Sequence, residues 1–402
     1  AKHTAISTAC ARIIQGEFHE QFVVDMIQGG AGTSTNMNAN EVIANIALEA
    51  MGHEKGEYQY LHPNNDVNMA QSTNDAYPTA IRVGLLLGHD YLLNSLDKLI
   101  QSFAAKGLEF GHVLKMGRTQ LQDAVPMTLG QEFRAFATTL GEDLQHLKRL
   151  APQLLTEVNL GGTAIGTGIN ADPGYQRLAV ERLAIISNHP VVPAADLIEA
   201  TSDMGAFVLF SGMLKRTAVK LSKICNDLRL LSSGPRTGIN EINLPARQPG
   251  SSIMPGKVNP VIPEAVNQVA FEVIGNDLAL TLAAEAGQLQ LNVMEPLIAY
   301  KILDSIRLLT RAMDMLREHC IDGISANEAH CRQLVEQSIG LVTALNPYIG
   351  YENATRIAKI ALDTGRGVLE LVREEKLLDD ATLADILRPE NMIAPRLVPL
   401  KA

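Results

Sequence analysis

The sequence predicts a mainly α-helical protein, an elongated central bundle of long helices flanked by two small, mostly helical domains. Apolar residues recur at steps of three and four over long stretches, which is the spacing of one face of an α-helix. A helix of about 30 residues is about 45 Å long, more than an ordinary globular core requires. The 402-residue chain has no tryptophan and only 4% aromatic residues, so aliphatic side chains must fill its core.

Five stretches of the chain carry this helical pattern. The predicted helices are 79–108, 129–158, 207–228, a stretch beginning at Pro263, and 302–320. Pro152 is expected to bend the second helix, because proline lacks the backbone N–H that the helix ladder uses. Pro263 suits a first helical position, with Glu264 beside it in the first turn. Stripes this long commonly bury surface between subunits as well, so we expect an oligomer.

The composition of the chain changes twice and predicts three regions. Residues 1–72 form an N-terminal domain of short pieces rich in glycine and asparagine. Residues 73–325 form the central long-helix bundle. Residues 326–402 form a small C-terminal domain, where NPYIGY and RPENMIAPR interrupt short helices.

Charge and cysteine content exclude several classes of protein. The net charge of -10 argues against a binder of nucleic acid or of an anionic membrane, since such a protein needs a basic face. We find no signal-like start and no run of about 18 apolar residues. The four cysteines show no C-x-x-C spacing, which indicates reduced thiols. We therefore expect a cytoplasmic protein with no nucleic-acid or membrane partner.

Four polar segments interrupt the helical pattern and are expected to be loops: 28–40, 71–75, 115–126 and 250–260. They supply Thr33, Ser34, Asn36, Asn38, Ser72, Thr73, Asn74, Lys115, Arg118, Thr119, Gln120, Ser251, Ser252, Lys257 and Asn259. Nearly all of these are neutral hydrogen-bond donors, with a few cations among them. Such a set suits the binding of carboxylates and of the extra negative charge that forms when a proton leaves the neighbouring carbon.

Each motif also has a simpler interpretation. GGAGTS and GGTAIGTG (161–168) lack the lysine and Ser/Thr of a phosphate-binding loop, so no nucleotide site is predicted. QSTND is typical of a helix N-cap, a role compatible with substrate binding. The His-Cys pairs at 319–320 and 330–331 invite a metal interpretation, but about eleven helical residues would separate them by about 16 Å, so no metal is predicted. GSSIMPGKVNP by itself would more often be a surface linker.

The motifs together resemble the fumarase/aspartase superfamily of lyases, which release fumarate from succinyl-type substrates. GSSIMPGKVNP has the form of the specific G-S-S-x-M-P-x-K-x-N signature of these enzymes. The resemblance covers essentially the whole chain, through GGAGTSTNMNANEVIAN, QSTNDAYPTA, KMGRTQLQDAVPMTLGQEF, GGTAIGTGIN, SKICNDLRLLSSGPR and AGQLQLNVMEP. The wording of several motifs is closest to the aspartase branch, and a class II fumarase is expected to have another residue in place of Glu295.

The resemblance implies a lyase that removes the β proton of L-aspartate, passes through an aci-carboxylate, and releases fumarate and ammonia. By match to the family motif, the groups holding the β-carboxylate would be Thr33, Ser72, Thr73 and Ser252. Those holding the α-carboxylate would be Lys257 and Asn259, and those at the amino group Asn74 and Thr119. Ser251 would be the general base, made more acidic by backbone N–H groups and by Lys257. The glycines and proline of its loop would let the loop close over substrate.

The resemblance also implies a homotetramer whose active sites combine segments of three subunits, with no required cofactor; activation by Mg²⁺ stays open. Gln120 stands where fumarases carry a histidine paired with a glutamate that matches Glu264, so that acid dyad is not expected here. The chain starts at AKHTAISTACARII, inside the first domain of the family, and we expect a fragment or a shortened member. Two alternatives are a class II fumarase or other fumarate-releasing lyase, and an inactive helical scaffold.

Overall fold

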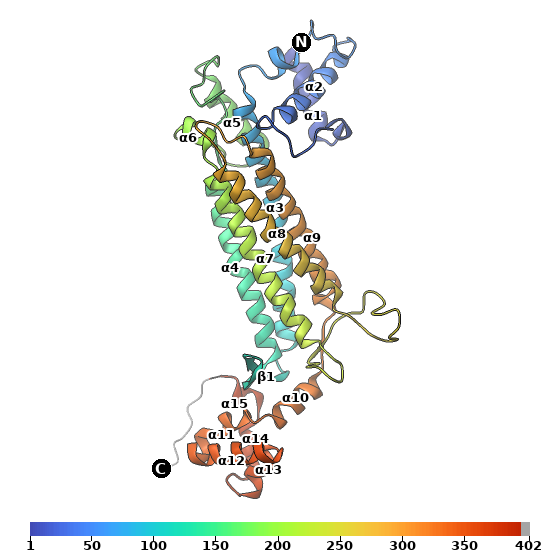
Figure 1. Cartoon of the computed structure of the whole chain (residues 1–402), viewed down its shortest axis with the longest axis vertical. Helices are drawn as coiled ribbons and strands as arrows, with labels where there is room; N and C mark the ends of the chain where they lie inside the picture. Colours follow the sequence, from blue (N-terminus) through green and yellow to red (C-terminus); the bar gives the residue numbers. More distant parts are fainter. Residues whose placement is uncertain (395–402) are drawn as a thin grey trace. The chain divides into compact units, whose positions relative to one another are not determined.

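The computed structural model describes residues 1–394 and confirms a mainly helical protein (Figure 1). Each predicted helical stretch lies largely within one long helix. These helices are α3 (Thr73–Glu109), α4 (Leu129–Leu155), α7 (Gly205–Leu231), α8 (Val261–Glu285) and α9 (Glu295–His319). None of the described helices combines the length and the apolar character that crossing a membrane would require.

Shorter elements complete the described chain. The shorter helices are α1 (Lys2–Ile14), α2 (Thr33–Ala50), α5 (Tyr175–Ser187), α6 (Leu197–Ser202), α10 (Glu328–Gln337), α11 (Leu341–Ile349), α12 (Tyr351–Thr364), α13 (Val368–Glu374), α14 (Asp380–Ile386) and α15 (Pro389–Met392). The strands pair two by two. Antiparallel pairs are β1 (Leu114–Thr119) with β2 (Gln122–Thr128) and β5 (Ile242–Asn243) with β6 (Ser325–Ala326), and the parallel pair is β3 (Glu157–Val158) with β4 (Val192–Pro193).

The chain divides into two compact units, and each contains several separate segments. Unit 1 comprises Ala1–Asn94, Asp143–Val219 and Val269–Arg311. Unit 2 comprises Ser95–Glu142, Lys220–Gln268 and the described chain from Ala312 onward. The division into regions 1–72, 73–325 and 326–402 concerns stretches of sequence and stays a prediction, and its last residues, 395–402, lie outside the described part of the chain.

In unit 1, segments of the long helices lie side by side (Figure 1) and are joined by buried polar contacts. An Arg82 guanidinium N–H of α3 donates to the Leu154 carbonyl of α4 at 2.8 Å. Ser211 of α7 donates to Asp277 of α8 at 2.8 Å. The apolar residues predicted to form one face of these helices are buried; Phe207, for example, is fully buried. Unpaired polar groups in such an interior are costly, so these hydrogen bonds also help to define helix register.

Unit 2 has an aromatic cluster and a hairpin packed on short helices. Phe133 of α4 lies between Phe103, Phe110 and Phe136, with ring centroids 5.3 to 6.1 Å apart. Strands β1 and β2 contact α10, α11 and α15 (Figure 1). Leu114 and Met116 of β1 supply the buried side chains of that contact. The hairpin is therefore held on an apolar base.

Segment 71–75, expected to be a loop, is helical from Thr73 onward, and two further loop predictions are wrong over most of their length. Residues from Thr33 onward form α2, because Gly32 adopts a left-handed conformation (φ 87°) and starts the helix directly behind it. Segment 115–126 lies mostly in the β1–β2 hairpin, where its residues pair across the two strands, as Lys115 does with Met127. The polar side chains of both segments are thus carried by regular structure rather than by flexible backbone.

Several helix boundaries also differ from the prediction: α3 starts at Thr73 rather than at residue 79, and α9 starts at Glu295 rather than at residue 302. The helix expected over 129–158 ends at Leu155, because the next residues extend to pair with β4, as Val158 does with Pro193. Helix α8 starts at Val261, so Pro263 is its third residue rather than its first. The first N–H groups of a helix have no intrahelical partner, so a proline is tolerated throughout that turn.

Replacing Phe133 by alanine should destabilise the protein strongly, because this ring is fully buried among three others. We expect a loss of about 3 to 5 kcal/mol in the free energy of unfolding, measured by denaturant titration. The exposed Phe22 provides the matched variant, and Phe22→Ala should change stability much less. Equal losses for the two variants would contradict the cluster as a stability element.

Candidate active site

The QSTND segment forms the start of helix α3, and its serine and aspartate cap that helix reciprocally. The Asn74 backbone N–H donates to Ser72 Oγ at 3.2 Å, and the Ser72 N–H donates to Asp75 Oδ1 at 3.0 Å. This is the capping-box arrangement, which satisfies two backbone donors at once. The N-cap interpretation of QSTND is therefore confirmed, and it places Ser72, Thr73 and Asn74 on a rigid helix start.

Asp75 also binds the glycine-rich segment 161–168. Its Oδ2 accepts from the N–H groups of Gly161 at 3.0 Å and Thr163 at 2.9 Å, and the residue is fully buried. Burial raises the pKa of the Asp75 carboxyl, and the surrounding backbone N–H groups partly offset that rise. Two amides of GGTAIGTG thus bind a carboxylate of the protein itself.

The side chains around Asp75 connect the two predicted segments of unit 1. The Asn74 side-chain NH₂ donates to the Ala164 carbonyl at 2.8 Å. Asn36 of α2, one turn after Thr33, donates to Thr73 Oγ1 at 3.0 Å. The Thr33 hydroxyl itself donates to the Gly30 carbonyl at 2.8 Å. Segments near residues 33 and 73, well apart in the sequence, are therefore brought together.

Tyr77 also holds the segments near residues 33 and 73 together, although it is not one of the predicted site residues. A side chain at Gly32 would lie 2.4 Å from the Tyr77 ring, so only glycine allows this approach. The Tyr77 hydroxyl is hydrogen-bonded to Thr35, and burial raises the pKa of this phenol to about 12. Tyr77 thus fixes the start of α2 against α3.

In unit 2, Thr119 and Gln120 lie at the tip of the β1–β2 hairpin. Gln120 (φ 55°) and Leu121 (φ 62°) form its two-residue turn, and left-handed backbone is unusual for such side chains. Arg118, directly before them, donates to Glu241 Oε1 at 2.6 Å. Lys115 of the same strand lies 2.7 Å from Glu241 Oε2. The hairpin is therefore held at its base by a fully buried carboxylate.

Lys115 forms ion pairs with two carboxylates at once. Lys115 Nζ contacts Glu132 Oε2 at 2.5 Å as well as Glu241. Burial on its own lowers the pKa of this ammonium, but the two carboxylates outweigh burial and the pKa is raised. Lys115 stays charged and structural, so this cation is used inside the fold rather than offered to substrate.

The GSSIMPGKVNP segment forms an exposed loop that its own residues close. Asn259 donates to the Gly250 carbonyl at 2.6 Å, and a Cβ at Gly250 would lie 1.8 Å from the Lys257 carbonyl oxygen. Glycine is therefore required where the two ends of the loop meet. Ser251 Oγ accepts from the N–H groups of Ile253 at 3.2 Å and Met254 at 3.1 Å.

The structure distributes the ten predicted residues between the two units. Unit 1 contains Thr33, Ser72, Thr73 and Asn74, and unit 2 contains Thr119, Gln120, Ser251, Ser252, Lys257 and Asn259. The four in unit 1 are linked through Asn36 and Tyr77. In unit 2 the hairpin and the loop form separate segments. Their common role in one site stays a prediction.

Three buried acids were not among the predicted site residues: Asp75, Glu241 and Glu295. The spacing S-x-x-D in QSTND was an available signal for Asp75. Glu241 has no local motif, since its partners lie more than one hundred residues away. Glu295 lies at the start of α9 and is 1% exposed.

Glu295 is the most unusual of these acids. Neither carboxyl oxygen of Glu295 has a hydrogen-bond partner among the described residues. Burial raises the pKa of Glu295 to about 8, with a smaller lowering effect from the Arg82 charge. The same carboxyl interacts electrostatically with Tyr77. Strongly perturbed acids of this kind often occur at functional sites.

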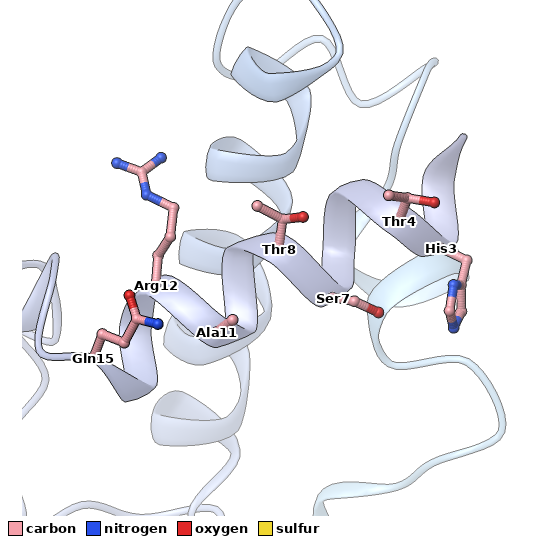
Figure 2. Close-up of a pocket in the computed structure, with 7 residues that line it drawn as sticks. All are labelled: His3, Thr4, Ser7, Thr8, Ala11, Arg12 and Gln15. Atoms are coloured by element: carbon pink, nitrogen blue, oxygen red, sulfur yellow. The ribbon is translucent and has the colours of Figure 1, made fainter.

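Candidate metal sites and cavities elsewhere in the described chain give weaker support for a function. The cysteines are free, and the His-Cys pair at 330–331 has other partners: Cys331 donates to the Glu241 carbonyl and His330 contacts the Ile239 carbonyl. Within residues 1–394, no group of three or more His, Cys, Asp or Glu could hold a metal ion. A cavity of about 500 Å³ lies along one face of α1. Figure 2 shows the residues that line it, none of them a predicted site residue: His3, Thr4, Ser7, Thr8, Ala11, Arg12 and Gln15.

Comparison with known proteins gives consistent matches. A lyase family model matches residues 1–275, and a model of the fumarase C C-terminus matches residues 341–394. An aspartate ammonia-lyase from Pseudomonas fluorescens is 90% identical over 401 residues, covering 100% of this chain and 84% of that protein. A solved fumarate lyase:delta crystallin from Brucella melitensis bound to cobalt is 61% identical (TM-score 0.95; 98% and 85% of the two chains). A class II fumarase from Schistosoma mansoni is 35% identical (TM-score 0.90; 97% and 84%).

Glu295→Gln should change how stability depends on pH. The ordinary pKa of 4.5 is raised to about 8 in the folded protein, so between these values the folded state keeps a proton that the unfolded state releases. Stability from this group therefore falls as pH rises through the window, by about 1.4 kcal/mol per pH unit. Glutamine removes this loss, so the variant should match the parent near pH 4.5 and exceed it near pH 8.5.

Thermal unfolding across this pH range measures the effect. Glu285, exposed on α8, provides the matched control, and Glu285→Gln should leave the pH profile unchanged. A Glu295→Gln profile parallel to that of the parent would show that Glu295 titrates normally.

Proposed function

The chain belongs to the lyase family, as one of its aspartate ammonia-lyases, and from this premise we propose how its residues carry out the reaction. As a carbon-nitrogen lyase it converts L-aspartate reversibly to fumarate and ammonia. The identity to the Pseudomonas fluorescens enzyme along the whole chain carries this conclusion. The class II fumarase is far less similar, so a fumarase is the weaker alternative.

The first step that we propose is removal of the β proton by the Ser251 alkoxide. The electron pair of the broken C–H bond moves into the β-carboxylate, which becomes an aci-carboxylate dianion. Hydroxyl donors would stabilise the new charge more than they stabilise the substrate, which is the condition for catalysis. The donors assigned to the β-carboxylate are Thr33, Ser72, Thr73 and Ser252. Lys257 and Asn259 would hold the α-carboxylate.

In the second step the dianion collapses, the C=C bond of fumarate forms and the C–N bond breaks. The nitrogen leaves with the bonding electron pair and its three hydrogens, that is, as ammonia. Since the substrate nitrogen is already protonated, this step needs no separate acid. Gln120 in place of a histidine is therefore compatible with the reaction, with Asn74 and Thr119 contacting the amino group.

The geometry of the 250–259 loop supports Ser251 as the base. A serine hydroxyl ionises only when its alkoxide is stabilised, and the two backbone N–H groups that donate to Ser251 Oγ do this directly. Lys257 of the same loop would add positive charge when the loop closes. Gly256, at φ 78°, gives the backbone the freedom that such a closure uses.

We also propose a homotetramer in which segments of different subunits complete each active site. Helix α8 supports this, because one face is buried and another carries large exposed apolar residues. The exposed fractions on that face are Phe271 61%, Ile274 37%, Leu278 63% and Leu282 61%. A contiguous apolar stripe of this kind marks a contact surface.

The proposed chemistry transfers a proton and expels ammonia, and no external oxidant or reductant takes part. It therefore requires no redox cofactor, while activation by Mg²⁺ would be an additional property. We propose a cytoplasmic location, which the four free cysteines support because thiols persist in a reducing compartment.

Ser251→Ala should nearly abolish turnover of L-aspartate. We expect kcat to fall about 10²- to 10⁴-fold, as for loss of a general base, with a smaller fall for Ser252→Ala. The assay follows fumarate absorbance with L-aspartate, L-malate and argininosuccinate in parallel. An unchanged kcat for Ser251→Ala would identify another base, and conversion of L-malate in preference to L-aspartate would overturn the assignment.

Leu278→Glu should disrupt the oligomer, because a charge would be buried in the apolar contact of α8. Light scattering coupled to size exclusion should show a smaller species, with loss of activity. Leu362, which is exposed on α12, supplies the control, and Leu362→Glu should remain a tetramer. A Leu278→Glu tetramer would exclude this face of α8 from the interface.

A further inference from the structure

The glycine-rich segment 161–168 has no part in the mechanism above, yet its backbone is tightly specified. Gly161 and Gly166 have φ of 92° and 99°, and Thr163 has φ 56°. A side chain at Gly166 would lie 2.4 Å from the Ile198 backbone nitrogen, so glycine is required there. Asp75 binds the two amides of Gly161 and Thr163.

Thr163 is unfavourable at its position in two ways. A β-branched residue seldom adopts left-handed backbone, because its side chain crowds the chain. Its hydroxyl is buried and finds no hydrogen-bond partner in the described part of the chain. A conformation that is unfavourable at one residue persists only when surrounding contacts enforce it. Here the enforcing contact is the carboxylate of Asp75.

The left-handed conformation of Thr163 sets the position of the next carbonyl group, that of Ala164. The carbonyl of Ala164 accepts a hydrogen bond from the side-chain NH₂ of Asn74 at 2.8 Å. The Asn74 backbone carbonyl in turn accepts from Asn159 Nδ2 at 2.9 Å. Since a backbone carbonyl can only accept, the Asn74 amide cannot be flipped without losing its partner. One N–H of its NH₂ group is used in this hydrogen bond, and its Oδ1 remains to accept a hydrogen bond.

An amide oxygen is the right group for an amino substrate. The ammonium of L-aspartate has only donors, so it pairs with an acceptor and is repelled by a second N–H donor. A flipped Asn74 would present its NH₂ instead. The orientation of this one amide therefore decides whether the site accepts or repels the nitrogen that the reaction expels.

We propose that Asp75 and the 161–166 turn are positioning elements that hold Asn74 with its oxygen available to the amino group of the substrate. They thereby favour amino-bearing dicarboxylates over those without nitrogen. The inference rests on the proposed function, because it presupposes that Asn74 contacts the amino group.

Two ligands that differ by the amino group test the proposal, namely L-aspartate and succinate. The primary variant is Gly166→Ala, because a Cβ there would lie 2.4 Å from the Ile198 backbone nitrogen, so the turn that places the Ala164 carbonyl must shift. We expect KM for L-aspartate to rise about tenfold, as for a lost hydrogen bond to a charged group. The inhibition constant of succinate should stay within about twofold. Asp75→Asn, which cannot accept from all three amides, should act in the same direction.

Gly365→Ala is the matched control, since Gly365 also has positive φ (71°) but ends helix α12. It should change neither constant. Action through Asn74 adds a second requirement: in an Asn74→Ala background, Gly166→Ala should have no further effect on KM. Circular dichroism confirms folding, and Gly166→Ala decides the question if Asp75→Asn does not fold.

Equal weakening of both ligands by Gly166→Ala would mean general damage to the site and would overturn the proposal, as would unchanged binding of both. Additive effects with Asn74→Ala would do the same. These outcomes are separate from failure of the proposed function, which would appear as a parent protein that does not convert L-aspartate.

Discussion

A carboxylate buried away from water must find hydrogen-bond donors inside the fold, and at Asp75 this requirement organises the part of unit 1 that carries Ser72, Thr73 and Asn74. Three backbone N–H groups bind it, one from the start of α3 and two from the 161–168 segment. Each of these amides would otherwise be a buried group without a partner. The single carboxylate therefore caps a helix, closes a glycine-rich turn and joins parts of the chain 86 to 88 residues apart.

Unit 2 also contains a buried carboxylate that needs partners, that of Glu241, but its partners are cations. Glu241 is fully buried, and two cations of β1 satisfy it instead of amides, so the hairpin tip is held by ion pairs at its base. Glu295 stands in contrast to both, because nothing in the described chain binds its carboxyl. Natural sequences usually depart from complete polar satisfaction near functional sites, and an acid kept neutral by burial is such a departure.

Much of the fold and of the chemistry could be read from the sequence. The long helices follow from apolar spacing alone, because each stripe is a local property of about three turns of chain. The motif GSSIMPGKVNP pointed to a base and to carboxylate-binding residues, and the lyase assignment it suggested is correct. Boundaries were less accurate: residues 33–40 looked like loop because glycines precede them, yet Gly32 starts a helix.

Residue types and helical periodicity were thus determined locally, by patterns that each segment carries within itself. Contacts between distant segments were decided only by the tertiary structure, since a lone Asp75 or Glu241 in sequence shows no sign of its partners. The orientation of the Asn74 amide belongs to this second class, because it depends on a carbonyl 90 residues further along the chain. Hydrogen bonds of that range depend on the completed packing, and no local pattern encodes them.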